Sequence, residues 1–420
     1  MKKNKLNLLN EGYDKGDLFI KGKGSIVYTQ KKKYIDLSCG AGTLLLGHNS
    51  KVYKNSLSRF LKSGLSQFSH PNISANLFSK NLNHFFPYFE KFILCNTGAE
   101  ANTKAIRIAR AVSKKNLIIS VTGSWHGSID QFLFNTQKKY KWFELNNSKN
   151  IKPLSEGVDK SLAKNLKYIP YNNIELSKKI LDKFKSKICC IFVEPIQGGF
   201  PTSTALHYLN FLDQYCKGNK IILIFDEILS GIRIGGTSLQ NKYGFSPALS
   251  TFGKILGGGT PIGVIGVDKK ISREINKKNI FFGGTYSGNS LSTFIGNETL
   301  KYIKKNRIKI FSKIEKKSNL FEKKINEFVI KNNIDAKVIR FYSIIRIIFT
   351  NKKVTNRHQR DFLEKDKYKK RIKFIEYLNK NKIYFPANGI IFFNFSLTSS
   401  QNNYFINKFC IGLKKYFKKK

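Results

Sequence analysis

Short apolar runs alternate with helical stretches through the middle of the chain. Several of these runs are apolar on both faces, as strands buried within a parallel sheet are. We expect strands at residues 91–95, 116–121, 188–193, 220–225 and 262–267. Between them the pattern takes a helical period, as at residues 100–113, where Ala105, Ile106 and Ala109 share a face. The alternation predicts an α/β fold whose large domain has three layers, with helices on both sides of a mostly parallel sheet.

The two ends of the chain have a different pattern. Residues 24–28 and 34–37 resemble short strands and precede a glycine-rich turn at residues 40–42. Beyond residue 300 we expect a Lys-rich helix, a strand-like stretch at 338–350, a charged helix at 361–381 and a closing strand at 390–396. We therefore expect a smaller α+β domain built from both termini, with residues 1–58 and 300–420 flanking a large domain at 59–299.

Basic side chains outnumber acidic ones by 75 to 27, which gives a formal net charge of +48. Such a charge alone favours a polyanionic partner, either nucleic acid or an anionic membrane surface. However, the chain has 64 Lys and only 11 Arg, whereas proteins that bind bases favour the bidentate Arg fork. We therefore favour a surface charge set by composition over a functional anion-attracting surface, and we expect only weak, salt-sensitive DNA binding.

Cysteine usage and the absence of long apolar runs indicate the compartment. Six Cys show no paired metal-ligand spacing, and Cys189 and Cys190 lie in an apolar run that favours buried thiols. Residues 1–20 lack the apolar block of a signal peptide, and no stretch approaches the ~18 apolar residues that a spanning helix needs. We expect a cytoplasmic protein with no bound metal and no membrane segment.

A lysine in a glycine-rich segment is the first candidate for chemistry. Lys254 lies between a strand-like run and three consecutive glycines at 257–259, which allow close approach of a ligand to the backbone. A partly desolvated lysine there can lose its proton and form an imine with a carbonyl compound. The alternative is an ordinary surface lysine in a flexible loop.

An apolar strand that ends in two carboxylates is the second candidate. Residues 221–225 lead directly into Asp226 and Glu227. Ligands of open α/β sheets bind outside the carboxyl ends of the strands, so Asp226 is expected at the floor of a site. A buried carboxylate needs a cationic partner there, and a pyridinium nitrogen would be one. The alternative is a helix cap.

Two further segments place polar or aromatic groups at strand ends. Thr97, Gly98 and Ala99 lie between a strand and a helix, where free N–H groups and the helix dipole favour phosphate, although a generic capped helix has the same pattern. Trp125, which precedes His126, is suited to stack on a flat ligand or to pack in the core.

These segments belong to a series of motifs that resembles a known family. The series is N-T-G-A-E-A at 96–101, W-H-G at 125–127, E-P-I-Q-G at 194–198, F-D-E-I-L-S-G-I-R at 225–233, T-F-G-K-I-L-G-G-G at 251–259 and G-T-Y-S-G-N at 284–289. Their order is similar to that in the class III aminotransferases, which are fold-type I pyridoxal 5'-phosphate (PLP) enzymes. The likeness covers nearly the whole chain.

The resemblance implies a role for each matching residue. Lys254 matches the Schiff-base lysine and proton carrier, and Asp226 matches the carboxylate that keeps the pyridine nitrogen protonated. Thr285 matches a phosphate contact donated across a homodimer interface. The cofactor-binding residues implied are Thr97, Gly98, Ala99, Trp125, His126, Glu194, Gln197, Asp226, Lys254 and Thr285. Ala99 stands where the family has a hydrogen-bonding side chain, and Trp125 where it has Tyr or Phe.

The resemblance also implies the reaction. An amino group would move from a small-molecule amino donor to a carbonyl acceptor, without a metal. The C-terminal stretch resembles the aminomutase subgroup, which transfers the amino group within one molecule. However, the mutase residues are replaced by Gly40-Ala41, by Ser128 and, at the position of its active-site Glu, by Ile391. We favour an aminotransferase of mutase-like architecture, with glutamate-1-semialdehyde aminomutase activity as the alternative and a non-catalytic nucleic-acid-binding protein as a distant one.

Overall fold

The computed structural model describes residues 18–136 and 151–419. A seven-stranded sheet forms its larger part, with strand order β4-β12-β11-β10-β9-β5-β8. All strands run in one direction except β12, which is antiparallel to both of its neighbours. The strands are β4 (Lys91–Cys95), β5 (Leu117–Val121), β8 (Leu166–Ile169), β9 (Ile188–Val193), β10 (Ile222–Asp226), β11 (Leu249–Gly253) and β12 (Gly263–Val267).

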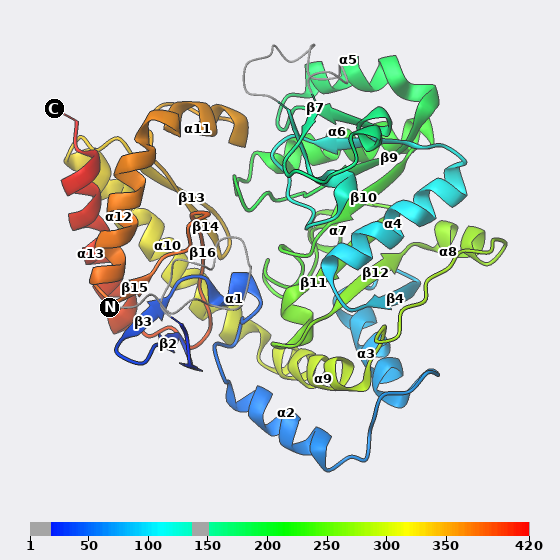
Figure 1. Cartoon of the computed structure of the whole chain (residues 1–420), viewed down its shortest axis with the longest axis horizontal. Helices are drawn as coiled ribbons and strands as arrows, with labels where there is room; N and C mark the ends of the chain where they lie inside the picture. The colour runs from blue at the N-terminus through cyan, green and yellow to red at the C-terminus, as the bar shows by residue number, and fades with distance from the viewer. Residues whose placement is uncertain (1–17, 137–150, 420) are drawn as a thin grey trace.

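Helices cover both faces of this sheet because its central strands are apolar on both sides. In β10, Ile222 and Ile224 belong to one buried cluster, whereas Leu223 and Phe225 belong to the other. The first cluster includes α4 (Gly98–Ser113), and the second includes α5 (Ile174–Phe184) and α6 (Ala205–Asn219). The expected α/β/α sandwich with a mostly parallel sheet is confirmed (Figure 1).

Further helices extend the larger part toward its lower edge in the view of Figure 1. There α9 contacts both α2 and α3. The larger part also carries two short helices and a hairpin of two short strands. The bounds are α2 (Lys51–Leu61), α3 (Ile73–Phe85), α7 (Leu239–Tyr243), α8 (Lys269–Ile275), α9 (Ser290–Lys305), β6 (Phe134–Thr136) and β7 (Ile151–Pro153).

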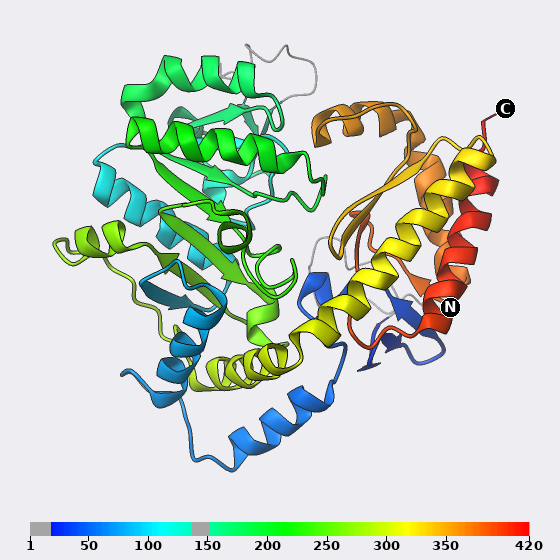
Figure 2. The same ribbon diagram turned by 180° about the vertical axis from the view of Figure 1, so that it is seen from behind.

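The smaller part combines both ends of the described chain. Strand β15 pairs with β3 in a four-stranded sheet, so C-terminal and N-terminal segments lie side by side (Figures 1 and 2). A second sheet has the order β13-β14-β16 and packs against the C-terminal helices. The elements are β1 (Lys21–Lys23), β2 (Ile26–Tyr28), β3 (Lys33–Asp36), α1 (Cys39–Gly42), α10 (Arg307–Lys331), β13 (Lys337–Phe341), β14 (Ile344–Ile348), α11 (Arg357–Glu364), α12 (Tyr368–Lys380), β15 (Ile383–Tyr384), β16 (Ile390–Phe392) and α13 (Ser399–Phe417).

The five expected strands are present with small shifts of their ends, but other elements differ from expectation. The stretch expected at 338–350 is a hairpin that turns at Tyr342, which has φ +51°. The closing strand ends at Phe392, and a helix that we did not expect, α13, begins at Ser399. That helix had a sequence signal: Thr398 and Gln401 form a capping box, and Phe405, Phe409 and Leu413 repeat every four residues.

Three other expectations concern features away from the site. All six Cys are free, and Cys189 and Cys190 are buried as expected. Residues 1–17, which contain most of the segment examined for a signal peptide, lie outside the described residues. Within the described part of the chain, no helix combines the length and the apolar character that crossing a bilayer requires.

Candidate active site

A cavity of about 820 Å³ lies at the carboxyl ends of β10 and β11, between the larger part and the C-terminal elements. The larger part supplies the expected residues, and strand β14, helices α11 and α12 and the loop before β16 supply charged and polar groups. The expected residues that line the cavity are Thr97, Gly98, Ala99, Trp125, His126, Glu194, Asp226 and Lys254. The motifs that are far apart in the sequence thus meet in one space.

Lys254 follows β11 directly and begins a short 3-10 turn with a left-handed backbone, φ +49°. Glycine is required at the end of this turn: a Cβ at Gly258 would lie 2.1 Å from Thr299 Oγ1. Burial lowers the pKa of Lys254, although Asp226 and Glu194 oppose the shift. Within the described residues, the Lys254 amine has neither an ion pair nor a hydrogen bond. The amine of Lys254 can therefore act as a base or as a nucleophile.

Asp226 is held at the end of β10 by three donors. Its Oδ2 lies 2.7 Å from His126 Nδ1 and accepts a 3.0 Å hydrogen bond from Asn102 Nδ2, while Oδ1 accepts one from the Ile228 N–H. No Lys or Arg of the described residues forms an ion pair with this buried carboxylate. Asp226 therefore can accept a cationic ligand group, and it is not a helix cap.

Glu227 turns away from the cavity, although it adjoins Asp226. Its carboxylate accepts hydrogen bonds from the Leu239 N–H and from Ser230 Oγ. Burial raises the pKa of Glu227 to about 8. Of the two carboxylates at the strand end, one therefore faces the cavity and the other stabilises the turn that follows.

The N-terminus of α4 forms another wall of the cavity. Thr97 caps the helix, since its Oγ1 accepts a 3.1 Å hydrogen bond from the Glu100 N–H. The N–H groups of Gly98 and Ala99 lie in the first turn, where the helix itself supplies no acceptor. A Cβ at Gly98 would lie 2.5 Å from Ile228 Cδ1, so the helix start and the Asp226 loop pack closely because residue 98 is glycine. This end of the cavity suits an anion.

Trp125 exposes 58% of its surface and lines the cavity, so it is not a core residue. Its backbone N–H donates a 2.9 Å hydrogen bond to Glu194 Oε2, and the other oxygen of Glu194 accepts one from the Gly198 N–H. Burial raises the pKa of Glu194, with the Asp226 charge adding to the effect. The backbone contact fixes Trp125 and leaves its ring available for stacking.

His126 influences the cavity mainly through its contact with Asp226. Its ring is buried against Phe132 and Phe192, and its Nε2 has no hydrogen-bond partner in the described part of the chain. The contact with Asp226 makes it a positioning residue for that carboxylate.

Two expected residues lie outside the cavity lining. Gln197 is buried behind the wall, where its Nε2 donates to the Thr122 carbonyl and to Ser124 Oγ. Thr285 lies in an exposed turn, and its carbonyl accepts a 2.7 Å hydrogen bond from Gln67 Nε2. Their roles at a cofactor remain predictions.

Sequence reasoning missed the arginines of the cavity. Four of the 11 Arg line it, and Lys254 is the single lysine that does so among the described residues. The four arginines come from the C-terminal elements and are Arg346, Arg357, Arg360 and Arg371. Their sequence signal was their rarity in a Lys-rich chain. Arg233, in contrast, is buried away from the lining, bonded to the Gly42 carbonyl and packed over Phe392.

Comparison with known proteins agrees with this geometry. The profile of the family described as Aminotransferase class-III matches residues 11–368. Glutamate-1-semialdehyde 2,1-aminomutase of Wigglesworthia glossinidia brevipalpis is 32% identical over 79% of this chain and 75% of its own length. The enzyme of the same name from Archaeoglobus fulgidus is 33% identical over 73% of this chain and 70% of its own.

Solved structures share the fold. An omega-transaminase from Sphaerobacter thermophilus superposes with a TM-score of 0.86 at 19% identity, covering 94% of this chain and 90% of that one. A glutamate-1-semialdehyde aminomutase from Pseudomonas aeruginosa gives a TM-score of 0.81 at 16% identity, covering 94% and 88%. Together with the family match, these findings confirm the expected fold class, and the chain belongs to the class III aminotransferases, a family of PLP-dependent enzymes.

Proposed function

We propose that this chain moves an amino group from an amino donor to a carbonyl acceptor with PLP as its cofactor. The observation that carries the proposal is the pairing of groups in one cavity. The amine of Lys254, which has no ion pair or hydrogen bond among the described residues, and the buried carboxylate of Asp226 line the same cavity, at the carboxyl edge of the sheet. One can react with a carbonyl, and the other can stabilise a ring cation.

The residues present fit PLP at each of its functional groups. Lys254 would hold the aldehyde, Asp226 the pyridine nitrogen, and the Gly98 and Ala99 N–H groups the phosphate, with Trp125 against the ring. Glu194 lies beside Trp125, where it can contact the ring substituents or the substrate. When bound, PLP supplies an electron sink for the substrate carbon that carries nitrogen.

The protein's own groups then account for the proton movements. Burial lowers the pKa of Lys254, so the free amine needed to take a proton from the substrate carbon is more accessible at neutral pH. His126 and Asn102 hold Asp226 in place. The carboxylate of Asp226 would then favour the protonated form of the pyridine ring. Trp125 and Lys254 both line the cavity, so Trp125 would stack on one face of the ring while Lys254 acts from within the cavity.

A half-reaction tests this proposal. The purified protein loaded with PLP is expected to show a visible absorption band, and a competent amino donor is expected to convert that band in a single turnover. Addition of a competent carbonyl acceptor should restore it. A protein that binds no PLP, or that binds it and leaves every amine and oxo acid of a broad panel unchanged, would contradict amino transfer.

A second candidate is glutamate-1-semialdehyde 2,1-aminomutase activity, because the similar curated relatives carry that name. Strand β16 offers no carboxylate to the cavity: Ile390 and Phe392 line it, while Ile391 is buried in the core. We therefore favour transfer between two molecules. Incubation with glutamate-1-semialdehyde and no separate donor distinguishes the two, since only a mutase would move the amino group from C2 to C1.

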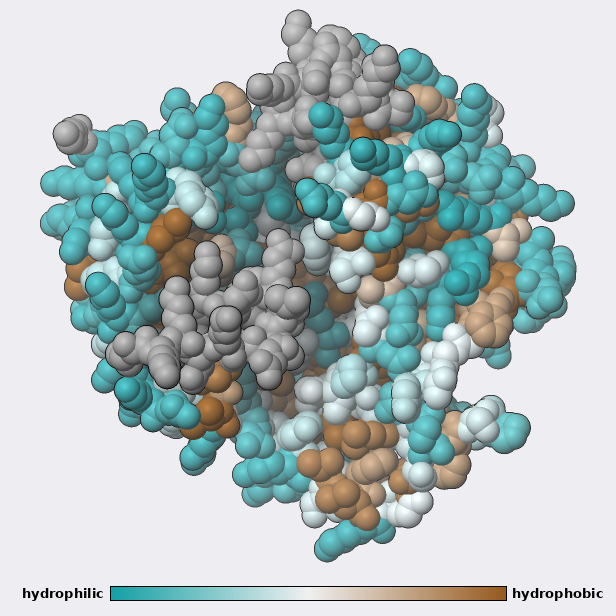
Figure 3. Space-filling view, viewed as in Figure 1, coloured by the Kyte–Doolittle hydropathy of each residue, from teal (hydrophilic) through white to brown (hydrophobic). Residues whose placement is uncertain are grey.

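We also propose that the active protein is a homodimer. Large apolar side chains are exposed on two segments, residues 61–77 and residues 281–291. Hydrogen bonds from Gln67 and Asn72 to the turn at residues 285–288 join the two segments. Figure 3 shows brown, hydrophobic surface in the lower part of the view, around α2. Contiguous apolar surface of this kind favours a protein interface. The exposed side chains are Leu61, Phe68, Ile73, Leu77, Phe281, Tyr286 and Leu291.

Replacing Thr285 with alanine tests whether this turn serves the partner's site. Loss of one hydrogen bond to a phosphate should raise the dissociation constant of PLP by about 10- to 100-fold, with an unchanged dimer mass. Fluorescence titration of the apoprotein and light scattering measure the two quantities. Thr204→Ala, an exposed threonine outside the cavity, is the matched control. A monomer at micromolar concentration, or unchanged PLP affinity in Thr285→Ala, would refute the shared site.

A further inference from the structure

The turn at residues 39–42 (α1 in Figure 1) has an unusual backbone for a segment beside the cavity. All four of its residues have positive φ, which is +47° at Cys39, +60° at Gly40, +54° at Ala41 and +87° at Gly42. A left-handed backbone is unfavourable for any residue with a Cβ, and such residues normally occur singly. Ala41 and the following Thr43 line the cavity together with Lys254. Strained backbone of this kind persists only where its surroundings hold it.

Groups from two other elements hold this turn at its ends. At its start, Cys39 Sγ donates a 3.1 Å hydrogen bond to the Phe392 carbonyl and accepts one of 3.4 Å from Asn394 Nδ2. At its end, the Gly42 carbonyl accepts a hydrogen bond from Arg233 Nη2. The smaller part of the protein therefore fixes the start of the turn, and an arginine of the larger part fixes its end.

Arg233 lies in the loop after β10 and reaches into the smaller part, where it is 1% exposed. Besides the bond to Gly42, its Nη1 donates to Ser343 Oγ at 3.4 Å, in the turn between β13 and β14. Its guanidinium also lies 4.7 Å from the centre of the Phe392 ring, which lines the cavity. One side chain thus joins the loop that follows Asp226 to three elements of the smaller part.

The backbone just before Arg233 is strained as well. Ile232 has φ +66°, an outlier for a β-branched residue. Its N–H donates a 2.9 Å hydrogen bond to the Thr237 carbonyl, and its carbonyl accepts one of 2.7 Å from the Gly236 N–H. Strained backbone clusters at active sites and ligand clamps. Here it occurs on both sides of one contact, the bond from Arg233 to the Gly42 carbonyl.

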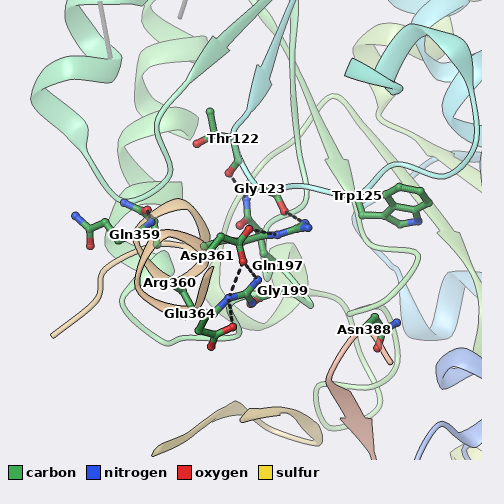
Figure 4. Close-up of polar contacts among 12 residues, drawn as sticks. Thr122, Gly123, Trp125, Gln197, Gly199, Gln359, Arg360, Asp361, Glu364 and Asn388 are labelled. Carbon is green, nitrogen blue, oxygen red and sulfur yellow. Dashed lines mark hydrogen bonds and ion pairs between the residues drawn. The ribbon is translucent and has the colours of Figure 1, made fainter. Parts of the chain in front are cut away.

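The guanidinium of Arg233 has no acidic partner in the described part of the chain. Arg360, which is buried to a similar degree, pairs with Asp361 and lies 3.8 Å from Glu364 (Figure 4). Burial lowers the pKa of Arg233 to about 10, so the group keeps its positive charge at neutral pH. Because a buried, unpaired charge is unfavourable, an apolar side chain would fill this space at lower cost. The charge therefore indicates a role beyond packing.

The charge of Arg233 also acts on Lys254. Burial is the main reason that the pKa of the Lys254 amine is lowered, and the charge of Arg233 lowers it further. The carboxylates of Asp226 and Glu194 act in the opposite direction. Removal of the Arg233 charge should therefore raise the pKa of Lys254.

We propose that Arg233 is a positioning residue of the active site, which holds the left-handed turn at residues 39–42 and the Phe392 ring as a wall of the cavity and whose charge acts on Lys254. This proposal rests on the proposed amino transfer and adds a residue that sets the shape of its site. Arg233 does not line the cavity, so it acts through the groups that it holds.

Alkylation of Cys39 in the full chain, with or without PLP, measures whether the turn stays in place. Cys39 and Cys216 are both buried, the first in the turn and the second on α6 of the larger part. Arg233→Met keeps an apolar chain but loses the charge and the donors. We expect iodoacetamide to modify Cys39 of this variant about 10- to 100-fold faster than in the wild type, with Cys216 unchanged. Mass spectrometry of the peptides measures both rates.

Further variants separate positioning from stability of the whole fold. Arg233→Lys, which keeps the charge and one donor, should give an intermediate rate at Cys39, and it replaces Arg233→Met if that variant does not fold. Arg273→Met, at an exposed arginine on α8, should behave as the wild type does. Adding Ala41→Gly to Arg233→Met should restore part of the protection, because glycine adopts φ +54° without steric cost. Equal acceleration at Cys39 and Cys216, or an unchanged rate at Cys39, would overturn the proposal.

The pH profile of PLP attachment gives a readout that a purely structural role would not move. Attachment to Lys254, fixed by borohydride, requires the deprotonated amine. Since loss of the positive charge raises the pKa of Lys254, the midpoint of attachment should move to higher pH in Arg233→Met and stay near the wild-type value in Arg233→Lys. One midpoint common to all three proteins would contradict the action on Lys254. If Arg233→Met exposes Cys39 but the wild type converts no amine, amino transfer alone is refuted.

Discussion

Replacing Lys254 with alanine is expected to abolish amino transfer while leaving the fold intact. The variant loses both the amine that holds the cofactor and the base that carries the proton, so the half-reaction rate should fall on the order of 10⁴- to 10⁶-fold. The side chain makes no hydrogen bond or ion pair within the described residues, so its loss leaves no partner group unsatisfied. Stopped-flow absorbance with a competent donor measures the rate.

The same variant has a second readout in covalent attachment. Borohydride treatment of the wild type should fix the cofactor to the chain at Lys254, and mass spectrometry should find no such adduct in Lys254→Ala. Lys269→Ala, an exposed lysine at the start of α8, should behave as the wild type does. Fixation at a different lysine in the wild type would overturn the assignment of Lys254.

The pH dependence of attachment follows from the position of Lys254. Because burial lowers the pKa of this amine, its reactive deprotonated form persists to lower pH than that of an exposed lysine. Attachment should therefore slow as the pH falls through this lowered pKa. It should still be fast at a pH just below 10.5, the ordinary pKa of a lysine.

Local patterns revealed the frame of the site because its parts lie at strand ends. The strands of the central sheet are buried on both faces, and their apolar runs are visible without knowledge of the fold. Lys254 and Asp226 follow such runs directly, so their sequence neighbours indicate where they lie. The start of α4 is equally local, with Thr97 as its cap.

The four arginines that line the cavity could not be found in this way, because their place in it depends on tertiary structure. Arg346 lies in a strand that predicts a hydrophobic core, and Arg357 and Arg360 lie on a charged helix that predicts a solvated face. Only the packing of α11 against Gly123 and Gly199 brings Arg357 and Arg360 to the cavity that Lys254 also lines. The small number of Arg in this Lys-rich chain singles these residues out, but a count of residues does not say where they lie in the fold.

Replacing Asp226 with asparagine is expected to lower the half-reaction rate about 10²- to 10⁴-fold. Removing one charge of a buried pair costs about 3–5 kcal/mol, and each 1.4 kcal/mol corresponds to a factor of ten. Asparagine keeps the size of the side chain but is neutral, and its single oxygen cannot accept both the hydrogen bonds from Asn102 and His126 and the one from the Ile228 N–H. The loss should appear in the rate of the chemical step, and covalent attachment at Lys254 should survive.

The neighbouring carboxylate provides the control for this prediction. Glu227 occupies the next position of the same strand end, yet it bonds the Leu239 N–H and Ser230 and does not line the cavity. Glu227→Gln should therefore change the denaturation midpoint and leave the half-reaction rate close to that of the wild type. If Asp226→Asn reacted as fast as Glu227→Gln, the cofactor nitrogen would need no carboxylate partner here. A slow Asp226→Asn beside a normal Glu227→Gln would show that the effect comes from the side chain that faces Lys254, and not from disturbance of the β10 end.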